Sequence, residues 1–255
     1  MHRSVTMLGA LLWLPAALHS QTLAQRVASL GDGTLRLSFA ARAGVCGNGG
    51  NGITLVSDDE RGADGRGEWE NDCAPGPVRV SLRVRGGRVA DAHVYVGGRW
   101  RSPQSGTADL GTVPARQAAT ELLALAEGGR GDAEALVTAA TLADSVVVWP
   151  MLLRLARRPD LPLDTRRQAV FWLGQAAGEA ATRGLDSLAG DRSGELELRK
   201  HAVFALSQRP PDEGVPALVR IARANPHAEL RKTALFWLGQ SEDPRALALF
   251  EEILR

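Results

Sequence analysis

Side chains able to do chemistry are few and widely separated in this sequence. Beyond the N-terminal segment the histidines are His93, His201 and His227, and each stands alone. Catalysis needs a nucleophile, an acid or base, or a set of metal ligands within reach of one another. The sequence holds no Gly-x-Ser-x-Gly, no His-Glu-x-x-His and no phosphate-binding Walker loop. We therefore expect no enzyme, with no catalytic residue, no metal site and no cofactor.

The two cysteines, Cys46 and Cys73, lie in the N-terminal part of the chain. Two thiols without a nearby histidine make a poor zinc site. In an oxidising compartment such a pair is expected to form a disulfide. The bond would close a loop of about 27 residues and contribute roughly 3 kcal/mol on the chain-entropy model. Two reduced thiols are the alternative.

Two further patterns between these cysteines resemble binding motifs only formally. Residues 47–52 contain Gly-x-Gly-x-x-Gly, but a dinucleotide-binding loop requires a helix after it, and Ile53–Val56 is strand-like. We interpret the glycines as a turn. Residues 57–72 are rich in acids without the spacing of a calcium loop. They are interpreted as a solvated loop, with a loose cation site as the alternative.

The first residues differ from the rest of the chain. An apolar run from Val5 to Leu18 follows a short polar start, and small residues stand at Ser20 and Ala24. This pattern predicts a signal peptide over residues 1–24, cleaved after Ser20 or Ala24, and a periplasmic or secreted protein. The run is shorter than the roughly 20 residues of a membrane span. An N-terminal anchor or a core helix is the alternative.

Residues 26–105 are predicted to form a small β module, stapled by the disulfide. Apolar residues alternate at Leu35, Leu37 and Phe39, and again over residues 78–84. A hairpin turn is expected at residues 85–88, and Trp100 is expected to pack on the sheet. The whole module would have three to five strands.

Residues 106–131 are predicted to hold a linker and a leading helix. The polar residues 103–112 suit a linker, and a helix is expected over residues 115–127 with Thr112 as its N-cap. Two more helices, over 132–143 and 146–158, form a degenerate first repeat with Pro150 in a first turn.

The C-terminal half repeats one segment three times. Arg166–Gln175 returns as Arg199–Gln208 and as Arg231–Gln240, at offsets of 33 and 32 residues. A second apolar stretch follows each copy, which indicates two helices per repeat. A period of this length is typical of a helical solenoid.

These copies resemble HEAT repeats of the short bacterial, phycobilisome-lyase type. Glu197-Leu198-Arg199 and Glu229-Leu230-Arg231, each followed by alanine, an apolar pair and leucine, carry the resemblance. Leu163–Arg166 matches more loosely. The resemblance covers residues 132–255 and implies an α-helical solenoid that binds proteins. The fold class would then be α+β. A tetrapyrrole- or chromophore-handling lyase is the alternative that the same resemblance suggests.

On a helical wheel, three slots of each repeat point away from the core. They hold a basic residue, a phenylalanine and a glutamine: Arg167, Phe171, Gln175; Lys200, Phe204, Gln208; Lys232, Phe236, Gln240. An outward apolar ridge marks an interaction site. The alternative is that phenylalanine packs between neighbouring helices. Trp172 and Trp237 are expected between repeats, and Arg166, Arg199 and Arg231 are expected to pair with acids such as Glu197 or Glu229.

These observations favour an exported scaffold that binds a protein or peptide partner through its repeats. With 30 Lys and Arg against 29 Asp and Glu, the sequence lacks the basic excess of a nucleic-acid binder. We expect a monomer without a membrane span. A small-ligand sensor that uses the β module is a further alternative.

Overall fold

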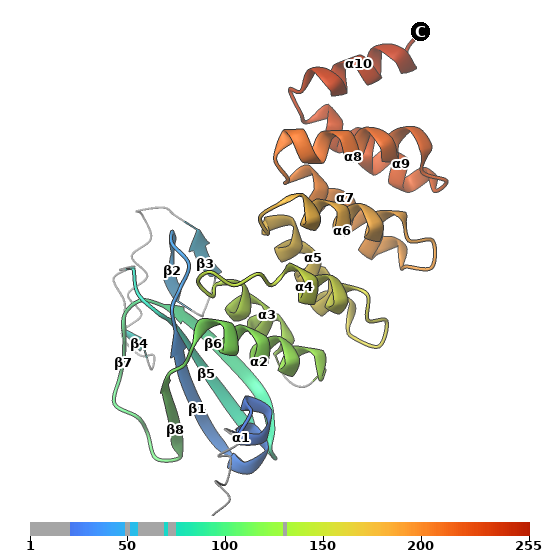
Figure 1. Cartoon of the computed structure of the whole chain (residues 1–255). Helices are drawn as coiled ribbons and strands as arrows, with labels where there is room; N and C mark the ends of the chain where they lie inside the picture. Colours follow the sequence, from blue (N-terminus) through green and yellow to red (C-terminus); the bar gives the residue numbers. More distant parts are fainter. Residues whose placement is uncertain (1–20, 49–51, 56–68, 71–74, 130–131) are drawn as a thin grey trace, which may run out of the picture.

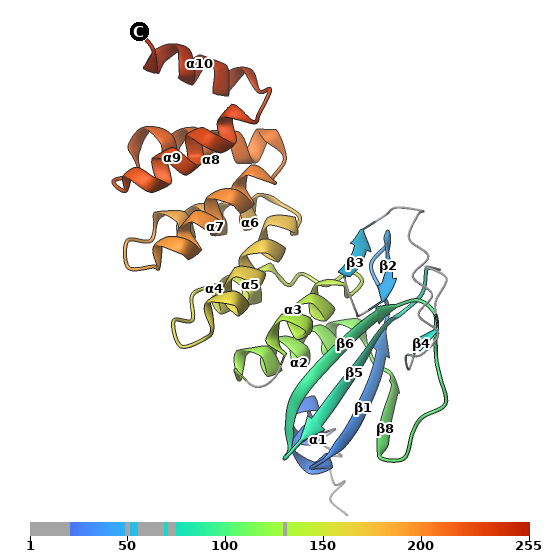
Figure 2. The ribbon, with the colours of Figure 1, turned by 180° about the vertical axis from the view of Figure 1, so that it is seen from behind.

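The computed structural model describes residues 21–48, 52–55, 69–70, 75–129 and 132–255. Figures 1 and 2 show a twisted sheet with helices on one face and a stack of helices that leads away from it. The strands are β1 Gly33–Phe39, β2 Val45–Asn48, β3 Gly52–Leu55, β4 Trp69–Glu70, β5 Val78–Arg85, β6 Arg88–Val96, β7 Arg99–Trp100 and β8 Thr107–Thr112. The helices are α1 Leu23–Leu30, α2 Ala115–Glu127, α3 Ala133–Thr141, α4 Trp149–Ala156, α5 Leu163–Gln175, α6 Glu179–Gly190, α7 Leu196–Ser207, α8 Pro211–Ala224, α9 Ala228–Gly239 and α10 Pro244–Ile253.

The main sheet has six strands in the order β3-β2-β6-β5-β1-β8. The alternation predicted from the sequence is confirmed, because Leu35, Leu37 and Phe39 pair with Leu82, Val80 and Val78 and all six are buried. Gly86 and Gly87 form the β5–β6 turn with φ of 54° and 69°, a conformation that glycine adopts without strain. Trp100 on β7 packs edge-on against Tyr95, as expected.

The sheet differs from the prediction at its edge. Residues 103–112 were expected to be a linker, but Thr107–Thr112 form β8, which pairs in parallel with β1. Thr112 therefore does not cap the following helix; its hydroxyl lies 3.1 Å from that of Ser38, and Pro114 is the N-cap of α2. β8 is an edge strand whose residues are half-buried or exposed, and its sequence lacks the apolar alternation of β1 and β5.

A second difference lies at the start of the described chain. Residues 23–30 form helix α1, although the sequence analysis placed the end of the signal peptide and the start of a strand there. Thr22 and Gln25 make a reciprocal capping box, which fixes the helix start. Leu23 and Val27 are buried on its inner side.

Several predictions fall on other parts of the chain. Residues 1–20 of the predicted signal peptide, Cys73 of the predicted disulfide, the tip of the glycine turn and most of the acidic segment 57–72 lie outside the described residues. The Cys46–Cys73 disulfide therefore stays a prediction. In the described ranges, no helix combines the length and the apolar character that crossing a membrane requires.

Backbone hydrogen bonds join the sheet directly to the helical part. The amide of Arg42 donates to the carbonyl of Leu142 over 2.8 Å, and the amide of Asp144 donates to the carbonyl of Ala40 over 2.9 Å. The Arg42 guanidinium also lies 5.8 Å from the ring centre of Trp172 on α5. The β module is thus attached to the end of the solenoid by more than the connecting chain.

The helical part has two layers, as predicted for a solenoid. Helices α3, α5, α7 and α9 pack side by side in one layer, here called the odd layer, and α4, α6, α8 and α10 form the other. The predicted helices are present, Pro150 lies in the first turn of α4, and α2 ends at Gly128. One continuous core runs from the sheet through the repeats.

The arginines that recur in each repeat donate to backbone carbonyls at the ends of the preceding helices. Nε of Arg166 donates to the carbonyl of Ala156 at the end of α4 (3.1 Å), and Nε of Arg199 donates to that of Ala189 on α6 (3.2 Å). Arg231 reaches the carbonyl of Asn225 after α8 (2.7 Å). These carbonyls have no partner within their own helices and lie at the negative end of the helix dipole. The expected pairing with an acid of the adjoining repeat is found for Arg166, which contacts Glu195 at 3.1 Å. Among the described residues, Arg199 and Arg231 bond these carbonyls without forming the expected ion pairs.

Candidate protein-binding face

The nine residues predicted for partner binding lie on three adjacent helices of the odd layer. Each of α5, α7 and α9 contributes one basic residue, one phenylalanine and one glutamine: Arg167, Phe171, Gln175; Lys200, Phe204, Gln208; Lys232, Phe236, Gln240. The fold therefore brings the three copies together. Their surroundings differ from one slot to the next.

The basic residues form a charge ladder with acids that were not among the nine predicted binding residues. Lys200 Nζ lies 3.2 Å from Glu197 Oε1, and Lys232 Nζ lies 2.9 Å from Glu229 Oε1. Arg167 contacts Glu197 of the next helix at 3.8 Å. The ladder comprises Asp164, Arg167, Glu197, Lys200, Glu229 and Lys232. The acid precedes the base by three residues in every copy, a spacing that places both on one side of a helix and could have predicted the pairs.

The charge ladder affects the acids that belong to it. A hydrogen bond from Lys232, followed by the charges of Lys232 and Lys200, holds the pKa of Glu229 below its ordinary value. Glu229 therefore stays ionised at neutral pH. The cations are already paired along the surface, so a partner meets alternating charges and not a row of unpaired lysines.

The phenylalanine slot is divided between packing and exposure. The half-buried ring of Phe204 lies 5.0 Å from the ring of Trp237 on the next helix, so it packs between repeats. Phe171 is half-buried and meets Trp172 edge-on at 5.3 Å. Phe236, on the last helix of the odd layer, is 58% exposed. The slot therefore packs against the next repeat at Phe204 and is exposed at Phe236.

The glutamines mark the C-terminal ends of the same helices. Gln175 ends α5 and is half-buried, whereas Gln208 and Gln240 are the exposed C-caps of α7 and α9. Nε2 of Gln208 donates to the Ser207 hydroxyl over 3.1 Å. The glutamines thus lie along one rim of the face, one or more turns away from the charge ladder.

A shallow cavity of about 260 Å³ opens between α3, α5 and α7. Its lining comprises Glu134, Asp164, Arg167, Gln168, Phe171 and His201. Burial, and next the nearby Arg167 charge, lower the pKa of His201, so this imidazole is neutral at pH 7. Glu134 had no signal in the sequence, because it comes from the degenerate first repeat. Gln168 and His201 occupy the same slot of two successive repeats.

The structure also keeps the histidines apart. His93 lies on β6, where its Nδ1 is 3.7 Å from Asp91, His201 lies on α7, and His227 is the N-cap of α9. Within the ranges that the structure describes, no cluster of three or more histidine, cysteine or acidic side chains could hold a metal ion. The polar groups of the odd layer suit recognition of another chain by contact.

Comparison with known proteins decides what these paired helices are. Residues 191–255, which contain α7 to α10, match the family model of HEAT repeats. The chain carries HEAT repeats. The match includes both Glu-Leu-Arg segments on which the resemblance was based, so that prediction is confirmed. Comparison with curated proteins and with solved structures gives no match.

The HEAT array thus includes the part of the chain that holds two of the three ladder pairs. Arrays of HEAT repeats commonly act as non-catalytic scaffolds that bind other proteins. Helices α5 and α6 precede the matched segment and continue its two layers without a break. The face described above is therefore a feature of the array and not of one isolated helix.

Proposed function

We propose that this protein is an exported, non-catalytic HEAT scaffold that binds another protein or a peptide through its odd layer. One observation carries the proposal: the charge ladder, the aromatic slot and the cavity lie on the same surface of adjacent helices. Solenoids use such extended surfaces to hold a partner along several repeats. A chain of alternating charges supplies orientation and specificity more than raw affinity.

The cavity suits a basic side chain of the partner. Asp164 is 86% exposed, and Glu134 is exposed at the opposite side of the cavity on α3. The ring of Phe171 lines the same cavity as these acids. A lysine or arginine of a partner would place its apolar stem on this ring and its charge near the two carboxylates. Arg167 balances only part of their charge, because it also contacts Glu197.

Phe236 offers a second contact at the other end of the same layer. It is a large apolar side chain left more than half exposed, and such a residue on a binding face supplies buried area when a partner covers it. A partner segment with a basic residue followed at a distance by an apolar residue would engage both ends. The paired ladder would lie between these contacts.

A displayed peptide library tests this proposal. The wild-type protein is expected to enrich peptides with basic residues, and Glu134→Gln with Asp164→Asn is expected to abolish that enrichment. Both substitutions remove charge at exposed positions, so thermal unfolding should stay unchanged. Glu179→Gln on α6, an exposed acid of the other layer, is the matched control and should bind like wild type. Equal enrichment by all three proteins would refute the proposed face.

Export is the other part of the proposal, and the position of α1 favours one of the two predicted cleavage sites. Cleavage after Ala24 would remove Thr22, which caps α1, and the Leu23 amide, which donates to Glu121 Oε2 over 2.6 Å. Cleavage after Ser20 would keep both. The exported protein is therefore expected to begin at Gln21. N-terminal sequencing checks this, and a mature chain that starts at Gln25, or one that keeps residues 1–20, would contradict it.

A further inference from the structure

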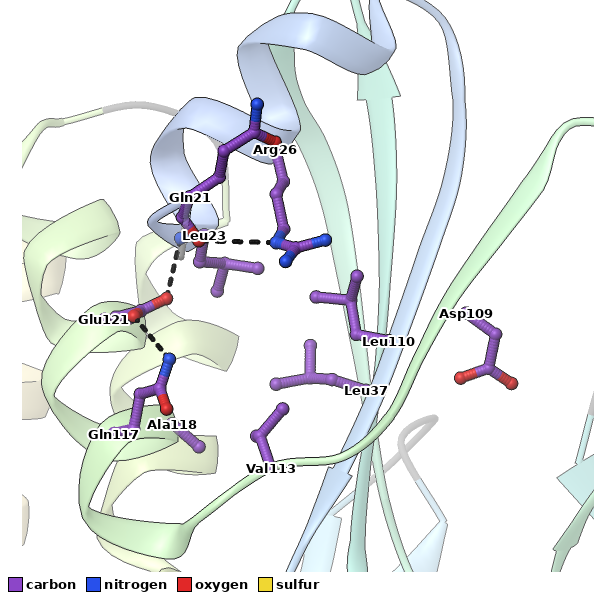
Figure 3. A pocket seen from close by; sticks show the side chains of 10 residues that line it. All are labelled: Gln21, Leu23, Arg26, Leu37, Asp109, Leu110, Val113, Gln117, Ala118 and Glu121. Atoms are coloured by element: carbon purple, nitrogen blue, oxygen red, sulfur yellow. Dashed lines mark hydrogen bonds between the residues drawn. The ribbon is translucent and has the colours of Figure 1, made fainter. Parts of the chain in front are cut away.

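A second cavity, also of about 260 Å³, lies in the β module and has no part in the proposed binding face. It is enclosed by α1, α2 and the edge formed by β1 and β8 (Figure 3). Five of its ten lining residues are apolar. Leu23, Leu37 and Ala118 are buried there, and the half-buried Leu110 and Val113 complete the lining.

The acids near this cavity already have hydrogen-bond donors. Glu121 Oε2 accepts the amide of Leu23 over 2.6 Å, and its Oε1 accepts Nε2 of Gln117 over 3.0 Å. Asp109 Oδ1 accepts the amide of Gly111 over 2.8 Å, and Figure 3 shows the carboxylate on the side of β8 away from the cavity. Both oxygens of Glu121 and Oδ1 of Asp109 are therefore already engaged as hydrogen-bond acceptors.

Arg26 differs from these acids. Its Nε donates to the carbonyl of Gln21 over 3.3 Å, and its guanidinium extends over the cavity toward Leu110 (Figure 3). No carboxylate of the described residues pairs with it. Its two terminal nitrogens are the donors that remain for a ligand, and a guanidinium presents such donors in the geometry of a carboxylate.

We propose that this cavity binds a small carboxylic acid with a short apolar body. The carboxylate would accept hydrogen bonds from Arg26, and the apolar part would fill the space above Leu37, Ala118 and Val113. At about 30 Å³ for each water-sized group, the volume accommodates roughly nine non-hydrogen atoms. Unbranched acids near hexanoate are therefore the expected size, whereas acetate is too small to fill the walls.

Titration calorimetry on the full chain tests the site with butyrate, hexanoate, octanoate and the neutral hexanamide. Hexanoate should bind, and hexanamide should bind at least tenfold more weakly because it carries no charge for Arg26. Arg26→Gln should weaken hexanoate at least tenfold. Arg85→Gln, an exposed arginine at the β5–β6 turn, should leave binding unchanged.

Several outcomes would overturn the proposal. They are the absence of binding by any of the acids at about 10 mM, equal affinity for hexanoate and hexanamide, or unchanged hexanoate affinity in Arg26→Gln. Affinity that rises with the chain length of the acid equally in wild type and in Arg26→Gln would show unspecific apolar contact and would also overturn the proposal. The Glu134→Gln, Asp164→Asn protein should bind hexanoate normally, so a failure of the partner-binding proposal leaves this test intact.

Discussion

The ring of Phe204 on α7 lies 5.0 Å from the ring of Trp237 on α9, and this contact joins two successive repeats. Phe236 occupies the equivalent position one repeat later, and it is 58% exposed. One slot of the repeat therefore serves two purposes. Inside the array it holds neighbouring helices together, and at the last helix of the odd layer it presents an aromatic surface.

Substituting the two phenylalanines should separate these purposes. Phe204→Ala removes a half-buried ring from between the repeats and should lower the free energy of unfolding by about 1–3 kcal/mol, less than a fully buried ring costs. Phe236→Ala removes an exposed ring and should change it by about 0.5 kcal/mol or less. Chemical denaturation measures both. Similar losses in the two variants would contradict the assigned packing.

Arg209 should be the most important single polar residue of the array. It is 4% exposed on its side chain, its Nε donates to the Thr182 hydroxyl over 2.8 Å, and Nη2 pairs with Glu213 at 2.7 Å. It also donates to the carbonyl of Gly174 in the last turn of α5 and to those of Ala176 and Gly178 in the α5–α6 loop. Arg209→Met leaves these carbonyls without this donor and Glu213 without its cation, although the Thr182 hydroxyl still donates to Glu213.

The expected loss for Arg209→Met is about 3–5 kcal/mol, typical of removing one partner of a buried pair. Arg209→Lys should recover little, because one ammonium group cannot reach loop carbonyls and carboxylate together. Arg183→Met, which breaks an exposed pair with Glu179, should cost about 0.5 kcal/mol or less. Denaturant midpoints of the three variants test these expected losses. An Arg209→Met variant with only a small loss of stability would refute the structural role assigned to Arg209.

Gly214 lies inside α8 for a steric reason. A Cβ atom there would clash with the carbonyl oxygen of Leu206 and press on Arg209. Gly214→Ala should therefore destabilise the protein by about 1–3 kcal/mol, although alanine is the better helix former. Gly190→Ala, whose Cβ would meet nothing within 4 Å at the end of α6, should instead stabilise by up to about 1 kcal/mol. Opposite shifts of Tm are the expected result.

Helix α10 should depend on pH through its N-cap. Hydrogen bonds from the side chain and then from the amide of Arg245 lower the pKa of Asp243 from 3.8 to about 2. A carboxyl whose pKa is lowered by folding stabilises the protein above its unfolded value. That contribution is lost as the pH falls from about 4 toward 2.

Asp243→Asn keeps a capping oxygen but removes the ionisation, so its stability should fall less steeply below pH 4 than that of wild type. Amide exchange in α10 between pH 2 and 5 measures the difference. Asp164→Asn, an exposed acid of another helix, serves as the comparison. Parallel curves for wild type and Asp243→Asn would show that the cap does not titrate in this range.

The sequence by itself determined the repeat and which side of each helix or strand is apolar. The period of about 33 residues, the apolar positions of each helix and the alternation of β1, β5 and β6 depend on local spacing, which the chain fixes without reference to distant residues. The acids three residues before Arg167, Lys200 and Lys232 belong to the same category, because one helix turn brings each pair together. The spacing of three residues therefore places these acids beside the basic residues of the predicted binding face.

Only the tertiary structure decided what covers each outward side chain. Ala205 occupies the slot of Trp172 and Trp237, and its Cβ lies 3.1 Å from where a Cβ on Gly174 would be, so the small pair lets α5 and α7 approach closely. A wheel gives the side of a helix but not the offset of its neighbour. Two other features could not be predicted from the sequence: the position of Glu134 in the cavity with Phe171, and the pairing of β8 with β1. These contacts join residues far apart in the chain and leave no pattern in either segment.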